Sequence, residues 1–132
     1  MREVKSDRQK ALALKKMAEV TLQRIKDSDI DKYASNNLKD YYDVIHELME
    51  AIASLEGIKI SGEGAHEKLI NHIVTRYAFG ESERIFLQEL RNIRNRITYE
   101  GFFVQPDYVK RNENKIKDII ERLGEIIKGK IS

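Results

Sequence analysis

Apolar residues recur along the chain every three or four positions in five segments, the period of an amphipathic α-helix. The clearest segment follows the polar residues 35–37 and runs to Gly57. Its apolar positions are Leu38, Tyr41, Ile45, Leu48, Ile52 and Leu55. Serine and asparagine are good helix N-caps and glycine is a common helix stop, so Ser35, Asn36 and Asn37 predict the start of a helix that ends before Gly57.

Four further segments carry comparable apolar stripes, over about residues 7–26, 65–79, 81–100 and 106–128. The stripes comprise Leu14, Ala18, Leu22 and Ile25; then Leu69, Ile70, Ile73, Val74 and Tyr77; then Phe86, Leu90, Ile93 and Ile97; and last Val109, Ile116, Ile119, Ile120, Leu123, Ile126 and Ile127. Residues 58–64 hold two glycines and are typical of a loop, and no segment shows the alternation of a strand. We therefore predict an all-α fold, an antiparallel up-and-down bundle of about five helices forming a single domain over residues 1–132.

Composition narrows the functions that this bundle can serve. The chain has 24 Lys and Arg against 22 Asp and Glu, a net charge of +2, so strong non-specific binding of nucleic acid by charge alone is not expected. The absence of cysteine excludes disulfides, thiolate zinc sites and cysteine nucleophiles. No apolar run reaches the ~18 residues that cross a bilayer, and residues 1–10 lack the apolar core of a signal peptide. We expect a cytoplasmic protein without membrane contact.

The three histidines give only weak indications of chemistry. His66 and His72 are six positions apart and do not share a helix face, and the zinc motif His-Glu-x-x-His is not completed after His66. No metal and no cofactor are expected. His46 lies on the flank of the second segment beside Tyr42 and Met49, where a histidine hydrogen-bonded between helices is the more usual interpretation than a catalytic base.

The strongest candidate for function is residues 91–101, RNIRNRITYEG, which hold Arg91, Arg94 and Arg96. At 100° per residue, Arg94 lies about 70° from the centre of the apolar stripe, on the flank of the core. Arg91 and Thr98 share its side, and Asn95 is adjacent. A guanidinium held at a packed edge is less hydrated and suits bidentate capture of a phosphate. An ion pair with a carboxylate of a neighbouring helix remains the alternative.

Two blocks of the sequence together resemble the HEPN superfamily of nucleotide-binding helical domains. Residues 38–58, LKDYYDVIHELMEAIASLEGI, with the loop after them and residues 66–70, HEKLI, look like the second HEPN helix and the entry into the third. Residues 91–101 look like the signature helix of the family. With the five-segment layout, the resemblance covers most of the chain.

The family signature is an arginine followed after four to six residues by a histidine, often with a polar residue directly after the arginine. Arg94 matches the arginine and Asn95 the polar residue, whereas Tyr99 stands at the histidine position. A tyrosine that is adenylylated in some members would fall at Gly101. Many members cut RNA without metal at a site formed across a two-fold dimer. A phenol, with an ordinary pKa near 10, is a poorer general base than an imidazole.

The resemblance therefore implies a nucleotide- or RNA-binding module, forming a homodimer, with weak or no ribonuclease activity. Its site would comprise Arg94, Asn95, Tyr99, Arg91 and Thr98. Two alternatives stay open, a partner subunit of a small nucleotidyltransferase, as in toxin–antitoxin pairs, and a metal-independent endoribonuclease. The pair Phe102-Phe103, and Met49 and Tyr42 on the second segment, are compatible either with a subunit contact or with the core of the monomer.

Overall fold

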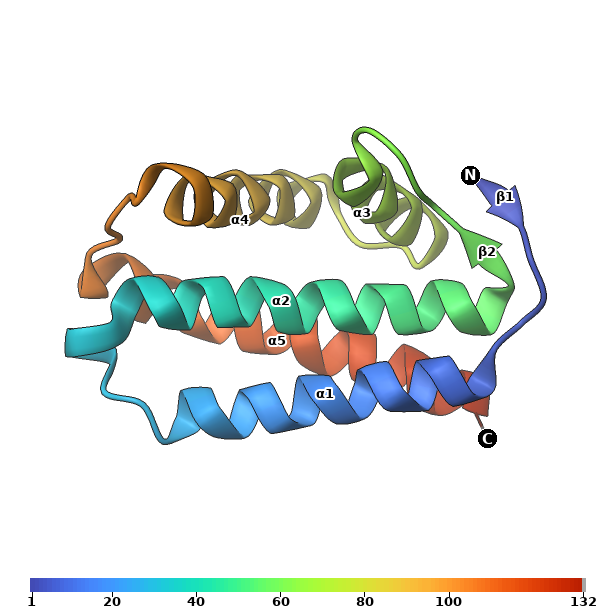
Figure 1. Ribbon diagram of the computed structural model, residues 1–132, viewed down its shortest axis with the longest axis horizontal. Coiled ribbons are helices and arrows are strands. Elements are labelled where there is room, and N and C mark those ends of the chain that lie inside the picture. The colour runs from blue at the N-terminus through green and yellow to red at the C-terminus, as the bar shows by residue number, and fades with distance from the viewer. Residues whose placement is uncertain (132) are drawn as a thin grey trace.

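Five helices carry most of the chain in the computed structural model, which describes residues 1–131 (Figure 1). They are α1 (Arg8–Lys26), α2 (Ile30–Glu56), α3 (Ala65–Arg76), α4 (Glu81–Glu100) and α5 (Pro106–Ile131). The prediction of an all-α helical bundle is confirmed, and each predicted segment corresponds to one helix. The two long segments that start at Asp7 and Pro106 begin as expected, because the Asp7 carboxylate accepts from the Lys10 backbone N–H at 2.9 Å and proline suits the first turn.

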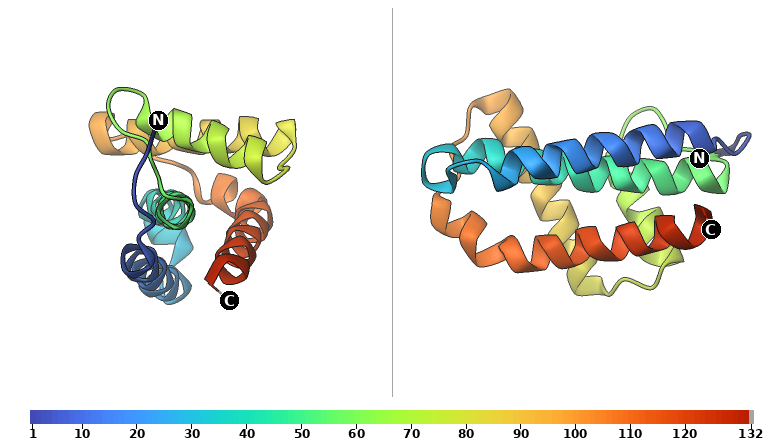
Figure 2. Two further views of the ribbon diagram at one scale, coloured as in Figure 1. Left: turned by 90° about the vertical axis from the view of Figure 1, so that its right-hand side faces the viewer. Right: turned by 90° about the horizontal axis from the view of Figure 1, so that it is seen from below.

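Helix α2 is the centre of the bundle and packs against each of the other four helices. Helix α1 runs antiparallel along one side of α2, and α5 runs along another side (Figure 1). Helices α3 and α4 form a second layer that crosses over α2 (Figure 2). Because these two helices carry the chain back in that second layer, α5 runs in the same direction as α2. Helices α2 and α5 are not consecutive in the chain, so their parallel directions are compatible with a chain that runs up and down the bundle.

Helix α2 starts earlier than predicted, at Ile30 instead of after residues 35–37. The side chain of Asp29 caps it, accepting from the Asp31 backbone N–H at 3.0 Å, and the helix then passes through an irregular residue at Tyr33. Ser35 does not cap this helix, since its hydroxyl accepts from the backbone N–H of Val104 at 2.8 Å. The serine thus fixes the α4–α5 connection to α2.

A short antiparallel pair of strands, which the sequence pattern did not predict, joins the start of the chain to the segment after α2. Strand β1 (Arg2–Glu3) pairs with β2 (Ile58–Lys59), inside the stretch expected to be a loop. Gly57 directs the chain into β2 with φ of 73°, a conformation that favours glycine, and its carbonyl accepts from the Val4 N–H at 2.8 Å. Two-residue strands are too short to produce a recognisable alternation.

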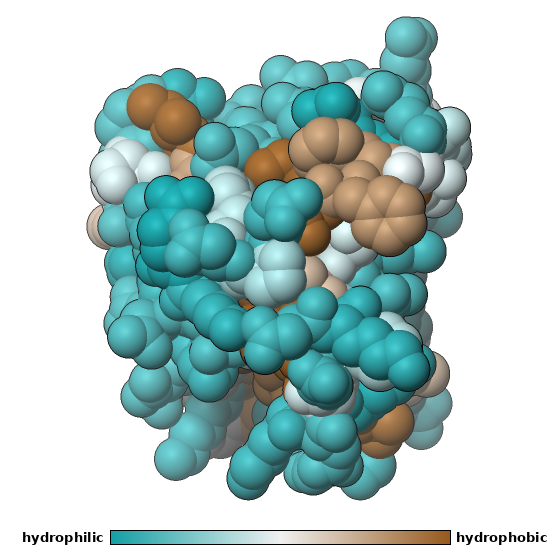
Figure 3. Space-filling model, turned by 90° about the vertical axis from the view of Figure 1, so that its left-hand side faces the viewer, coloured by the Kyte–Doolittle hydropathy of each residue, from teal (hydrophilic) through white to brown (hydrophobic). Residues whose placement is uncertain are grey.

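The apolar side chains considered for a subunit contact divide into two groups. Tyr42 and Met49 are fully buried in the core of the monomer, which is the second of the two alternatives left open for them. Phe103 is 81% exposed, beside the half-buried Phe102. Hydrophobic side chains gather on this end of the molecule, where α4 leads into α5, on an otherwise mainly hydrophilic surface (Figure 3).

Candidate anion-binding site

Arg94 lies at the edge of the core, where α4 crosses α2, as its position on the helix predicts. Its side chain is 20% exposed, and its Nε lies 3.4 Å from Oδ1 of Asp43 on α2. Its NH1 donates to Oδ1 of Asn95 at 3.4 Å. Both distances exceed the 2.7–2.9 Å typical of charge-assisted hydrogen bonds. The nearby carboxylate therefore offsets part of the charge of Arg94 but leaves much of its hydrogen-bonding capacity unused.

Arg94 opens into a hollow of about 350 Å³ between α1, α2 and α4. The lining residues are Met17, Thr21, Arg24, Asp43, His46, Glu47 and Arg94. Within residues 1–131, two buried side-chain nitrogen atoms have no hydrogen-bond partner, Nδ1 of His46 and Nε of Arg94. Both belong to residues that line this hollow. Unpaired buried polar groups are costly, and they point to a missing partner such as water or a ligand.

Two histidines from different helices stack beside Arg94. The ring centroids of His46 on α2 and His66 on α3 are 4.0 Å apart, with an angle of 14° between the planes. Tyr42 lies next to this pair, and its hydroxyl is 3.3 Å from Nδ1 of His66. The expectation that His46 is fully hydrogen-bonded between helices is wrong, since Nδ1 has no partner and Nε2 lies 3.7 Å from Glu50.

The surroundings keep both imidazoles neutral at neutral pH. Burial, the neighbouring His66 and the charge of Arg94 lower the pKa of His46 from 6.5 to about 4. Burial and the charges of Arg94 and Arg91 lower the pKa of His66 as well, against an opposing effect of Asp43. Each ring therefore presents one nitrogen that can donate and one that can accept.

Arg91 lies one helical turn before Arg94, and its side chain is also 20% exposed. Its Nε donates to Oε1 of Gln88 at 2.9 Å, and its NH2 lies 4.0 Å from a carboxylate oxygen of Glu67. Its charge reaches His66 and Tyr42. Arg91 is therefore part of the same electrostatic environment as Arg94, although it does not line the hollow.

Of the remaining predicted site residues, one lies beside Arg94 and two point to solvent. Asn95 contacts Arg94 directly, whereas Thr98 is exposed and Tyr99 is 77% exposed. Tyr99 lies about 140° around the helix from Arg94, so a single chain does not bring the two side chains together. The sequence interpretation missed Asp43 and the placement of His46 and His66. The spacing of Asp43, His46 and Glu47 along one face of α2 was an available indication of a polar site.

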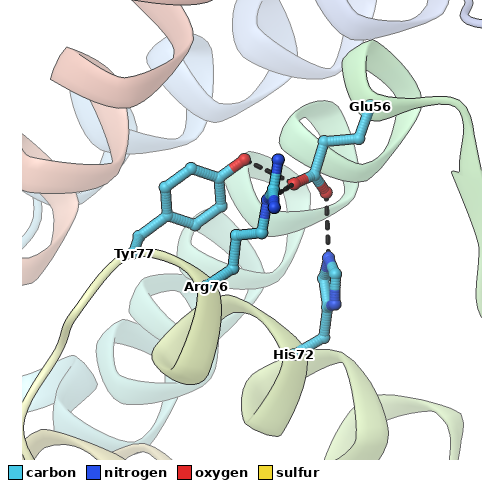
Figure 4. A network of polar contacts seen from close by, with 4 residues as sticks. All are labelled: Glu56, His72, Arg76 and Tyr77. Carbon is cyan, nitrogen blue, oxygen red and sulfur yellow. Dashed lines mark hydrogen bonds and ion pairs between the residues drawn. The ribbon is translucent and has the colours of Figure 1, made fainter.

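A second polar cluster lies near the C-terminal end of α2 (Figure 4). The carboxylate of Glu56, only 4% exposed, accepts from Nε2 of His72 at 3.0 Å, from Nε of Arg76 at 3.2 Å and from the hydroxyl of Tyr77 at 2.5 Å. Burial raises the pKa of Glu56, but the hydrogen bonds from Tyr77 and His72, together with the charges of His72 and Lys130, keep this pKa below its ordinary value. The three partners belong to α3 and its C-terminal cap, so this cluster attaches α3 to α2 and is separate from the Arg94 hollow.

Comparisons with known proteins give no further identification. No protein-family model, curated protein or solved structure matches the chain. Across residues 1–131, no group of three or more histidine, aspartate or glutamate side chains is arranged to hold a metal ion. A search of the same residues for a helix with the length and apolar character needed to cross a bilayer finds none.

Proposed function

We propose that the chain is a HEPN-like module that binds a phosphate group of a nucleotide or of RNA at Arg94. The observation that carries the proposal is a pair of buried nitrogen atoms without a hydrogen bond, Nδ1 of His46 and Nε of Arg94, in two residues that line one hollow. A phosphate offers several acceptor oxygens and accepts from guanidinium and imidazole N–H groups alike. A phosphate therefore suits both kinds of donor group that line the hollow.

The carboxylates of the hollow determine how a phosphate enters. Asp43 lies beside Arg94, and Glu47 has a pKa raised by burial and by the charge of Asp43. Arg24 makes a bidentate contact with Asp40, at 2.8 and 3.1 Å, so that its positive charge is more fully neutralised than that of Arg94. A bound phosphate therefore competes with Asp43 for Arg94, and the 3.4 Å contact between Arg94 and Asp43 is longer than a tight ion pair.

The electrostatics favour binding over cleavage. Metal-independent cleavage of RNA needs one group that accepts a proton and another that donates one. The lowered pKa of His46 and of His66 leaves both rings unprotonated at neutral pH, so neither is an effective acid there. Tyr99, at the histidine position of the family signature, is exposed at a distance around the helix. These features support the binding module ahead of the endoribonuclease.

The substitution Arg94→Gln tests the proposal. We expect it to weaken binding of a fluorescently labelled single-stranded RNA oligonucleotide by tenfold or more, because one charge-assisted hydrogen bond contributes about 1.5–3 kcal/mol. Fluorescence anisotropy gives the dissociation constant, and circular dichroism verifies that the helices are retained. Asp43→Asn is expected to tighten binding, since it removes the competing carboxylate.

Arg84→Gln is the matched control, because Arg84 lies on the same helix, pairs with Glu81 and makes no contact with the hollow. It changes the net charge by the same amount as Arg94→Gln. Equal affinities of the wild-type protein and Arg94→Gln contradict the proposal, as does an equal loss in both arginine variants, which indicates general attraction to a cationic surface.

A further inference from the structure

A larger cavity, of about 570 Å³, lies between the end of α1, the first half of α2 and α5. It is lined by Leu22, Ile25, Lys26, Ser28, Ile30, Asn37, Tyr41, Lys110, Glu113 and Lys117, and shares none of these residues with the Arg94 hollow. Its volume falls within the range of small-molecule sites in proteins. The cavity is thus a candidate for a second, independent ligand.

Asn37 is the feature of this cavity that the fold does not explain. The residue as a whole is only 3% exposed, and no hydrogen bond to its side-chain amide is present in the part of the chain that the structure describes, yet its amide atoms are not among the fully buried ones and keep some contact with solvent. Asparagine is a poor helix former, and a polar side chain that is so little exposed loses most of its contact with water. An apolar residue at this position of α2 would avoid both penalties. Asn37 lines the cavity, as it also lines a smaller hollow beside it, and its amide both donates and accepts hydrogen bonds, so a ligand in the cavity can pair with it.

The other lining residues define the chemistry of that ligand. Leu22, Ile25 and Ile30 form an apolar wall. The charged lining residues are three lysines, Lys26, Lys110 and Lys117, and one carboxylate, Glu113, so positive charge predominates.

The partners of these charged groups single out one lysine. Glu113 accepts from the hydroxyl of Tyr41 at 2.9 Å and lies 3.6 Å from Lys117, while Lys110 is held by Asp31 at 2.6 Å. Lys26 has no ion pair within residues 1–131 and remains available to an anion.

From this arrangement we infer that the cavity binds a small organic carboxylate with an apolar body and an amide group. The carboxylate meets Lys26, the apolar body lies against Leu22 and Ile25, and the amide pairs with Asn37. N-acyl amino acids with aromatic or branched side chains have this combination of groups. The inference does not depend on the Arg94 site.

The test uses N-acetylleucine and N-benzoylglycine as probes, with N-acetylleucinamide and N-benzoylglycinamide as uncharged counterparts. Isothermal titration calorimetry with the full chain is expected to show saturable binding of at least one carboxylate below about 10 mM, about tenfold tighter than its counterpart. Asn37→Leu is expected to weaken the carboxylate and its counterpart by about tenfold while leaving thermal stability unchanged or higher. Lys26→Gln is expected to weaken the carboxylate alone.

Asn36→Leu and Lys39→Gln are the matched controls, since neither residue lines the cavity. The inference is overturned if Asn37→Leu binds the carboxylates as tightly as the wild-type protein does. It is also overturned if neither carboxylate shows saturable binding. A loss of stability in Asn37→Leu without a loss of binding assigns Asn37 a structural role and equally overturns it. Should Asn37→Leu fail to fold, Lys26→Gln decides: a carboxylate preference that is unchanged in this variant contradicts the inference.

Discussion

Replacing Glu56 by alanine is expected to lower the free energy of unfolding by about 3 kcal/mol, since it removes the acceptor of three hydrogen bonds at once. Arg76 is 62% exposed and is solvated again at little cost, so most of the loss comes from the half-buried His72 and Tyr77. Glu56→Gln keeps an acceptor but not the charge, and is expected to lose about half as much.

Urea denaturation followed by circular dichroism measures these changes, and amide hydrogen exchange identifies where the protection is lost. The loss is expected first in α3, which the Glu56 cluster attaches to α2. Glu63→Ala is the control, because Glu63 is exposed and has no ion pair in the described structure, and it is expected to stay within about 0.5 kcal/mol of wild type. A similarly small change in Glu56→Ala contradicts the assignment of this cluster as the anchor of α3.

Acidification is expected to destabilise the protein through His46. The pKa of this residue is about 4 in the folded chain and 6.5 when it is unperturbed, so between these values the unfolded state binds more protons. The free energy of unfolding therefore falls as the pH falls from 6.5 towards 4. From pH 7.5 to pH 5 the contribution of His46 alone is about 2 kcal/mol.

Comparing the wild-type protein with His46→Gln isolates this contribution. Glu47 and Glu50 have raised pKa values, bind protons more readily when folded and oppose the trend in both proteins. We expect the stability of wild type to fall by about 2 kcal/mol more than that of His46→Gln between pH 7.5 and pH 5. Parallel stability curves would show that protonation of His46 is not resisted by the folded state.

The helices and the position of Arg94 follow from the sequence because helical periodicity defines the direction of the core. Leu90, Ile93 and Ile97 orient α4, and this orientation is sufficient to place Arg94 on the flank, where the structure has it. The same stripe did not show how deeply each residue lies. Leu90 is buried, whereas Ile93 and Ile97 are half-buried, because the depth depends on the layer above α2.

The histidine pair and the strand pair depend on tertiary arrangement and were not predicted. His46 and His66 meet because the chain turns back after α2 and places the first turn of α3 beside the middle of α2. Periodicity within each helix contains no information about that path. The start of α2 was missed because Ser35, Asn36 and Asn37 have the side chains of typical N-caps, whereas the residue that caps the helix is Asp29. Ser35 instead binds the backbone of the distant Val104, and Asn37 is buried.

The most direct test of an anion site at Arg94 is a titration with single-stranded RNA followed through the imidazole signals of the three histidines by ¹H–¹⁵N NMR. His46 and His66 lie beside Arg94, whereas His72 is held in the Glu56 cluster and serves as an internal reference. We predict that the signals of His46 and His66 shift in proportion to the bound RNA while those of His72 stay in place. Binding that leaves His46 and His66 unchanged, or that shifts His72 most, would contradict a phosphate site at Arg94.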